Sequence, residues 1–102
     1  MFGLREEEIR TIREILAKYD TIEEAVIYGK RAREEGCTCA GKVEIALKGE
    51  KVTVAEAKDV SYDLNEETLM KYCFHVVNYN GLKNNQLIDE INKEGVILYQ
   101  KK

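Results

Sequence analysis

Apolar residues near the start of the chain recur at steps of three and four residues, which is typical of one face of a helix and predicts a helix over residues 9–19. A second helical pattern runs over residues 53–64. Thr53 stands just before it and Glu56 follows three residues later, which is the spacing of a capping box. A third, shorter amphipathic pattern covers residues 87–91 and ends at Gly95.

Short apolar runs between these patterns predict four strands, over residues 24–28, 43–47, 72–79 and 96–99. Residues 30–35 form a further helical pattern that opens directly after the first strand. The predicted order is therefore α-β-α-β-α-β-α-β, a mixed α/β (α+β) sheet with helices packed on it. No linker, repeat or low-complexity segment interrupts the chain, so we expect a single domain over residues 1–102.

The composition narrows the class of function. The chain has 102 residues, a net charge of −3 and 44% hydrophobic residues, which indicates a globular domain and argues against a duplex nucleic-acid binder with its basic face. No apolar run approaches the roughly 20 residues that a membrane span needs. Acidic residues stand where a signal peptide carries its apolar stretch, so we expect a cytoplasmic protein. Three cysteines, an odd number, favour free thiols, metal ligands or a nucleophile over a disulfide framework.

One stretch carries a family resemblance. The sequence YGKRAR at residues 28–33, followed by VEIALKG at residues 43–49, resembles the minimal nucleotidyltransferases of the polymerase-beta superfamily, to which nucleotidyltransferase antitoxins belong. Those proteins carry G-S-x-A-R-G after a strand and D-x-D on the next strand. The strand predicted at 72–79 resembles the one that brings their third carboxylate. The resemblance implies a nucleotidyltransferase-like mixed sheet for nearly the whole chain.

The chemical positions depart from the family pattern. The resemblance implies a serine that holds nucleotide phosphates and three carboxylates that bind magnesium. Here Lys30 replaces the serine, and Lys42, Glu44 and His75 stand at the three carboxylate positions. Magnesium requires hard oxygen ligands, and these three side chains sum to a charge of about zero, or +1 with a protonated imidazole. We therefore do not expect ATP- and magnesium-dependent nucleotidyl transfer.

The single histidine and all three cysteines lie in two short clusters, which suggests thiol chemistry. Residues two apart on a strand share a face, so Cys73 and His75 point the same way, and the resemblance brings Glu44 beside them. A Cys–His–Glu set has the parts of a nucleophilic triad that hydrolyses a small-molecule ester. For Cys73 taken alone, the preferred interpretation is a small core residue, as free cysteines usually are. The further candidates are Cys37 and Cys39 as alternative nucleophiles, and Lys30 and Lys42 as stabilisers of an oxyanion.

Two other interpretations stay open. Cys37, Cys39, Cys73 and His75 have the count and types of a Cys₃His zinc site, although their spacing is shorter than that of a standard zinc knuckle. A catalytically silent family member would instead bind a nucleotide or a partner protein; the resemblance implies a HEPN-type toxin as partner. The phosphate-holding residues would then be Gly29, Lys30, Arg31 and Arg33. An intact framework around a rewritten loop at 34–42 favours deliberate redesign, with the Cys–His site as its purpose.

Overall fold

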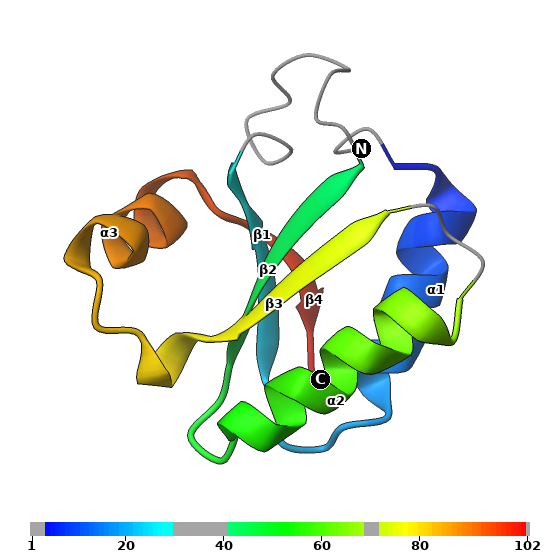
Figure 1. The fold of residues 1–102 in the computed structure, drawn as a ribbon, viewed down its shortest axis with the longest axis horizontal. Coiled ribbons are helices and arrows are strands. Elements are labelled where there is room, and N and C mark those ends of the chain that lie inside the picture. Colours follow the sequence, from blue (N-terminus) through cyan, green and yellow to red (C-terminus); the bar gives the residue numbers. More distant parts are fainter. Residues whose placement is uncertain (1–3, 30–40, 69–71, 102) are drawn as a thin grey trace.

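The computed structural model describes residues 4–29, 41–68 and 72–101, and it has the mixed α and β architecture that the sequence predicts (Figure 1). The helix predicted at 30–35 lies outside the described residues. So do five of the candidate site residues, namely Lys30, Arg31, Arg33, Cys37 and Cys39. The described elements, in chain order, are α1 (Glu6–Ala17), β1 (Glu24–Tyr28), β2 (Lys42–Lys48), α2 (Val54–Glu66), β3 (Cys73–Asn78), the short 3-10 helix η2 (Tyr79–Gly81), α3 (Asn85–Glu94) and β4 (Val96–Gln100).

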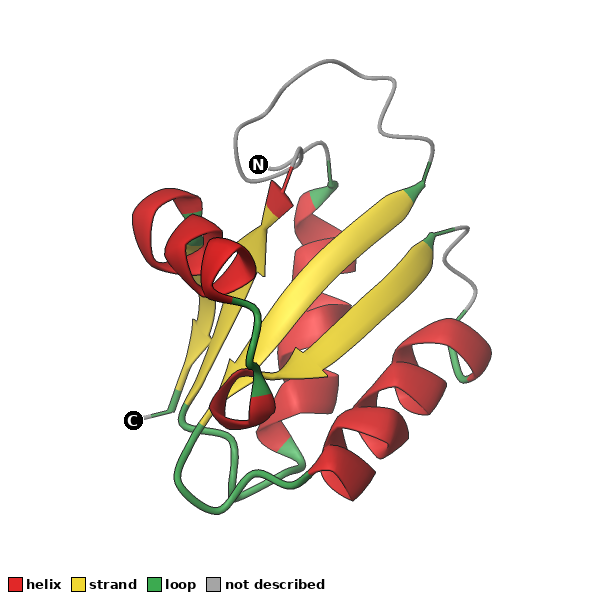
Figure 2. Ribbon diagram, turned by 60° about the vertical axis from the view of Figure 1, so that its left-hand side comes forward, coloured by secondary structure: helices red, strands yellow, loops and turns green. Residues whose placement is uncertain are grey.

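The four strands form one sheet in the order β3-β2-β1-β4 (Figure 2). Strand β1 pairs antiparallel with both of its neighbours, whereas β2 and β3 run parallel. The β1–β4 register shifts between Ala25 and Val26, so Leu98 has no partner in the ladder. Such a bulge turns an extra side chain toward the core, and Leu98 is indeed buried. Its carbonyl oxygen accepts a hydrogen bond of 2.8 Å from Arg13 Nε of α1.

Helices α1 and α2 cover one face of the sheet and build the larger core with it. Alternate strand residues point to this face, because successive side chains of a strand point to opposite sides. On β2 these residues are Val43, Ile45 and Leu47, all fully buried. The helices contribute the apolar positions whose spacing predicted them, including Ile12 and Leu16 of α1. This face therefore holds most of the apolar surface that stabilises the fold.

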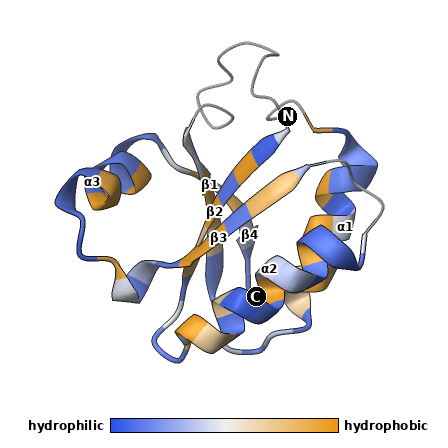
Figure 3. Cartoon of the chain, in the orientation of Figure 1, coloured by the Kyte–Doolittle hydropathy of each residue, from blue (hydrophilic) through white to orange (hydrophobic). Residues whose placement is uncertain are grey.

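The opposite face carries α3 and a smaller core. Val26, Tyr28 and Ala46 are buried there against Ile91 of α3. Helix α3 covers only part of the face, and the start of β2 alternates between apolar and polar residues (Figure 3). The polar residues of that alternation lie on the α3 face, so the ends of β2 and β3 that α3 leaves uncovered present polar groups to solvent.

The helix starts have the local chemistry that the sequence predicts. Thr53 Oγ1 accepts a hydrogen bond of 3.1 Å from the Glu56 N–H, and Glu56 Oε1 accepts one of 3.3 Å from the Thr53 N–H. The predicted capping box of α2 is thus confirmed. Asn84 caps the start of α3, and its side-chain oxygen accepts hydrogen bonds from the N–H groups of Gln86 and Leu87. Among the described residues, no helix is long and apolar enough to cross a membrane.

The outer edge of β3 is covered by a side chain of α2. Asn65 Nδ2 donates to the Phe74 carbonyl at 3.0 Å, and Asn65 Oδ1 accepts from the Phe74 N–H at 2.8 Å. One amide side chain thereby pairs both backbone groups of a strand residue whose edge has no neighbouring strand. This protects the strand from pairing with another chain at that point.

Candidate functional site

Strands β2 and β3 bring four of the candidate residues together. Parallel pairing sets Lys42 beside Cys73 and Glu44 beside His75. All four side chains lie on the α3 face, because Lys42 and Glu44 alternate with the buried Val43 and Ile45 of the other face. We call this set, Lys42, Glu44, Cys73 and His75, the β2–β3 cluster.

Within the cluster, the carboxylate of Glu44 pairs with a lysine of its own strand. Lys42 Nζ lies 3.3 Å from Glu44 Oε1, with the Lys42 side chain 53% exposed and that of Glu44 27% exposed. The two charges therefore neutralise one another at the beginning of β2. The partly buried position of Glu44 makes this pair less exposed to screening by salt than a pair in open solvent.

Gly29 follows the last residue of β1 and lies against the carboxylate of Glu44. Its φ of +79° lies in the left-handed region that favours glycine. A Cβ added at this position would overlap Glu44 Oε2, and it would lie 3.9 Å from Glu90 Oε2 of α3. The lack of a side chain at residue 29 is thus what lets the Glu44 carboxylate lie against the backbone.

A buried tyrosine lies beside the two carboxylates. Tyr28 is the cross-strand partner of Glu44 and is 4% exposed. Burial, together with the nearby negative charges of Glu44 and Glu90, raises the pKa of Tyr28 to about 12. The sequence pattern singled out neither Tyr28 nor Glu90. Tyr28 has the pattern of an ordinary strand residue and Glu90 that of a polar helix position, and only the fold brings Glu90 close to Gly29.

The thiol and the imidazole of the cluster lie next to each other. Cys73 Sγ is 3.7 Å from His75 Nε2, and both residues are exposed. The two side chains therefore share a face, as strand alternation predicts. Among the residues that the structure describes, no hydrogen bond joins Glu44 to His75. The carboxylate that the triad would need lies with Lys42 instead.

The remaining candidates cannot be placed around the cluster. Of the four residues considered for zinc, Cys37 and Cys39 lie outside the described part of the chain. Within the described part, no group of three or more His, Cys, Asp or Glu residues is arranged to hold a metal ion. Residues 30–33, considered for phosphate binding, also lie outside it, and only Gly29 of that set is described.

Comparison with known proteins gives no match to a protein-family model and none to a curated protein sequence. Similar folds do occur among solved structures. A toxin–antitoxin crystal structure with AMP-PNP aligns with a TM-score of 0.71 at 11% identity, over 97% of this chain and 76% of the other. The MntA–HepT toxin–antitoxin structure aligns with a TM-score of 0.70 at 10% identity, over 95% and 74%. A double Asp-to-Glu mutant of such a pair aligns with a TM-score of 0.68 at 12% identity, over 97% and 75%.

This chain has a nucleotidyltransferase-like fold. The structural similarity extends over nearly all of its length, which agrees with the family resemblance of residues 28–33 and 43–49. At 10–12% identity the similarity concerns the fold alone. What the nucleotidyltransferase-like domain does must be argued from its own side chains.

Proposed function

We propose that this chain is a nucleotidyltransferase-fold domain that does not transfer nucleotides and acts by binding a partner protein. The observation that carries the proposal is the ion pair of 3.3 Å between Lys42 and Glu44, in the cluster where the family resemblance expects carboxylates.

The charges of the cluster do not suit magnesium. The ion requires several hard oxygen ligands in a near-octahedral arrangement. Glu44 is the single carboxylate of the cluster, and the Lys42 ammonium beside it repels a divalent cation. His75 and Cys73 add soft ligand atoms in place of oxygens. The metal-dependent chemistry of the family therefore has no ligand set among these side chains.

The retained framework supports a binding role. Three solved structures with this fold are toxin–antitoxin structures. A domain with such a fold can bind a partner protein without the metal-dependent chemistry of the family, because binding needs no metal ligands. The family resemblance implies that a HEPN-type protein is the partner.

The close approach of Cys73 and His75 favours a second candidate, thiol-dependent ester hydrolysis. His75 would take the thiol proton, and the thiolate would attack the ester carbonyl carbon. The alcohol would leave with that proton, and water would then hydrolyse the thioester. This candidate ranks second because the Glu44 carboxylate is paired with Lys42, which leaves the imidazole without an orienting partner among the described residues. Alkylation of Cys73 that is fast at mildly acidic pH, and slowed by His75→Ala, would support it.

The test of the first proposal combines metal binding with activity. Mn²⁺ binding is followed by electron paramagnetic resonance, and adenylyl transfer is followed with ATP labelled at its α-phosphate. We expect neither from the unaltered chain. The variant Lys42→Asp/Glu44→Asp/His75→Asp should gain Mn²⁺ binding, whereas the matched control His75→Asn, which adds no carboxylate, should not. Metal-dependent adenylyl transfer by the unaltered chain would overturn the proposal.

A further inference from the structure

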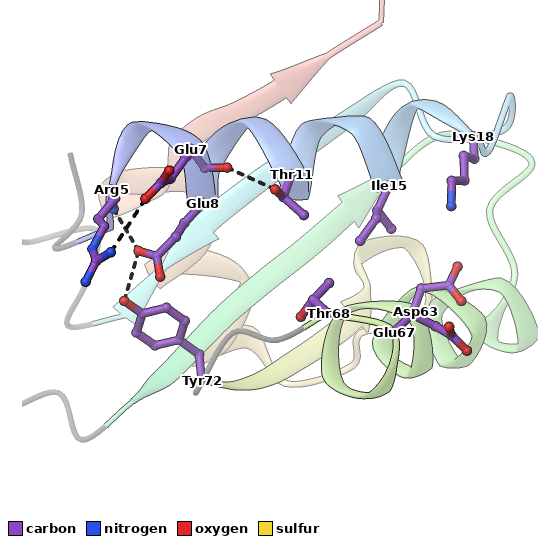
Figure 4. Close-up of a pocket in the computed structure, with 10 residues that line it drawn as sticks. All are labelled: Arg5, Glu7, Glu8, Thr11, Ile15, Lys18, Asp63, Glu67, Thr68 and Tyr72. Atoms are coloured by element: carbon purple, nitrogen blue, oxygen red, sulfur yellow. Dashed lines mark hydrogen bonds and ion pairs between the residues drawn. The ribbon is translucent and has the colours of Figure 1, made fainter.

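A large groove opens on the side of the sheet that carries α1 and α2, away from the β2–β3 cluster. It has a volume of about 870 Å³, within the range of roughly 300–1,000 Å³ that ligand pockets have. Figure 4 shows α1 along one wall and the end of α2 along the other. The lining residues are Arg5, Glu7, Glu8, Thr11, Ile15, Lys18, Asp63, Glu67, Thr68 and Tyr72.

The groove is negatively charged. Four of its lining residues are acids and two are bases, which gives the lining a net charge of −2. Arg5 forms an ion pair of 3.5 Å with Glu7, and both side chains are more than 70% exposed, so this pair is weak and easily exchanged. At the other end, the carboxylate of Glu67 makes no hydrogen bond or ion pair within the described part of the chain. A positively charged ligand would meet acids at both ends.

Hydrogen bonds hold the end of the groove that carries Arg5. Tyr72 presents its ring at this end, and its hydroxyl donates to Glu8 Oε1 at 3.0 Å (Figure 4). The Arg5 N–H donates to the same oxygen at 2.8 Å, which holds the Glu8 side chain at the start of α1. Ile15 of α1 lies farther along the groove (Figure 4). The lining therefore combines the apolar surface of the Tyr72 ring with charged groups at both ends.

The dimensions favour a helical ligand. From Glu7 to Lys18 the α1 wall rises through about 16 Å at roughly 1.5 Å per residue, which equals about three turns of a second helix. Most backbone groups of α1 and α2 are already bonded within these helices. An extended peptide would find no strand to pair with there, whereas a helix bonds its own backbone groups.

We propose that this groove is the docking site for the partner protein, and that the segment bound there is a helix with lysine or arginine residues flanking an apolar stripe. This inference rests on the proposed function and adds the place and chemistry of contact. The acids at the two ends pair with the basic residues, and the apolar stripe covers the ring of Tyr72. Net negative charge at the groove also accelerates the encounter with a basic partner.

The experiment uses the full chain and a fluorescein-labelled leucine–lysine helical peptide about 12 residues long, with binding followed by fluorescence anisotropy. We expect saturable binding that weakens when NaCl rises from about 0.05 M to about 0.5 M. The variant Glu7→Gln/Glu67→Gln should weaken binding about threefold to tenfold. The control Glu14→Gln/Glu66→Gln makes the same charge change on exposed positions of the same helices, outside the groove, and should leave binding unchanged.

A second variant tests the groove by its shape. Thr11→Trp places a large ring among the lining residues and should abolish binding, with circular dichroism confirming that the variant is folded. No binding by the unaltered chain, or an equal loss in both charge variants, would overturn the docking site. These outcomes are separate from the failure of the proposed function, which shows itself as metal-dependent adenylyl transfer in a different assay.

Discussion

On the face that carries α1 and α2, the inward residues of β1 and β2 are all buried, whereas on the α3 face burial extends only over part of the sheet. Ile27 and Ile45 on the first face are fully buried. On the second face Tyr28 and Ala46 are buried, but His75, one strand farther out, is exposed. The first face can hold little besides apolar side chains. The second combines enough packing to fix the strands with enough solvent access for charged groups.

This difference in burial between the two faces shows which positions of the fold can accept new side chains. Substitutions on the larger core remove packing on every side, because interiors are closely packed. The open part of the α3 face tolerates lysine, histidine and cysteine at neighbouring positions without loss of the sheet. A nucleotidyltransferase-like framework can therefore keep its shape while the chemistry of this face is replaced.

The largest difference in stability should appear when one apolar side chain is truncated on each face and the two losses are compared. Ile45→Ala should lower the free energy of unfolding by about 2–5 kcal/mol, because it leaves a cavity in the larger core. Val77→Ala, on the partly open face, should lower it by about 1 kcal/mol. Urea unfolding followed by circular dichroism measures both. Equal losses would mean that the two faces contribute alike to stability.

Gly29→Ala should destabilise the chain by about 2 kcal/mol. The backbone at residue 29 is left-handed, which is unfavourable for a residue with a Cβ, and the new Cβ overlaps the Glu44 carboxylate. In a Glu44→Ala background the same change should cost only about 1 kcal/mol, since the overlap is gone and the backbone strain remains. A double-mutant cycle in urea separates the two parts. Additive effects would show that Glu44 does not lie against residue 29.

Two tyrosines, one near each face, should titrate at high pH because both are desolvated, although different acids lie beside them. Burial raises the pKa of Tyr19 to about 12, assisted by its hydrogen bond with Asp63, and burial raises that of Tyr28 to about 12, assisted by Glu44 and Glu90. Ultraviolet absorbance should show Glu44→Gln lowering the pKa of Tyr28 while that of Tyr19 stays. A matching shift at both tyrosines would contradict this separation.

The same burial makes the stability depend on pH. An unfolded tyrosine loses its proton near pH 10, whereas folded Tyr28 keeps it until about 12. The contribution of Tyr28 is therefore complete below pH 10 and is lost as the pH rises through 12. Between pH 10 and 12, the free energy of unfolding of the Tyr28→Phe variant should fall by about 1 kcal/mol less than that of the unaltered chain. Urea unfolding at several pH values measures this difference.

The smallest effect is expected at the β2–β3 cluster itself. Lys42→Met should change the free energy of unfolding by about 0.5 kcal/mol or less, because the ion pair with Glu44 is partly exposed. Thermal unfolding at low and high salt checks this, since screening should remove even the small difference. A loss as large as that of Ile45→Ala would mean that the pair is part of the packing.

Most of the fold follows from local pattern. The capping box at Thr53 and the period of the apolar residues predicted α2, although the helix continues to Glu66 rather than ending near Leu64. The strand predicted at 72–79 begins at Cys73, and its end at Tyr79 becomes the short helix η2 instead. Ends of elements depend on tertiary contacts that a local pattern does not contain.

The site was predicted only in part. Strand alternation placed Cys73 with His75, because that relation needs nothing beyond the period of a strand. The direction of the Glu44 carboxylate could not be predicted in the same way. That direction depends on the ion pair with Lys42, two residues earlier. It also depends on the space left by the missing side chain of Gly29, which the β1–β2 register places beside Glu44. The origin of the rewritten loop by deliberate redesign stays a prediction.

The strand order has a consequence for how the chain folds. Residues 29–41 separate β1 from its neighbour β2 along the chain, whereas residues 29–95 separate β1 from its other neighbour β4. The entropy lost in closing a loop increases with its length, so joining β4 to β1 is the least favourable of the three pairings to begin. We expect β1 and β2 to pair early and β4 to complete the sheet last. In pulse-labelled hydrogen exchange, the amides of β4 should gain protection after those of β2.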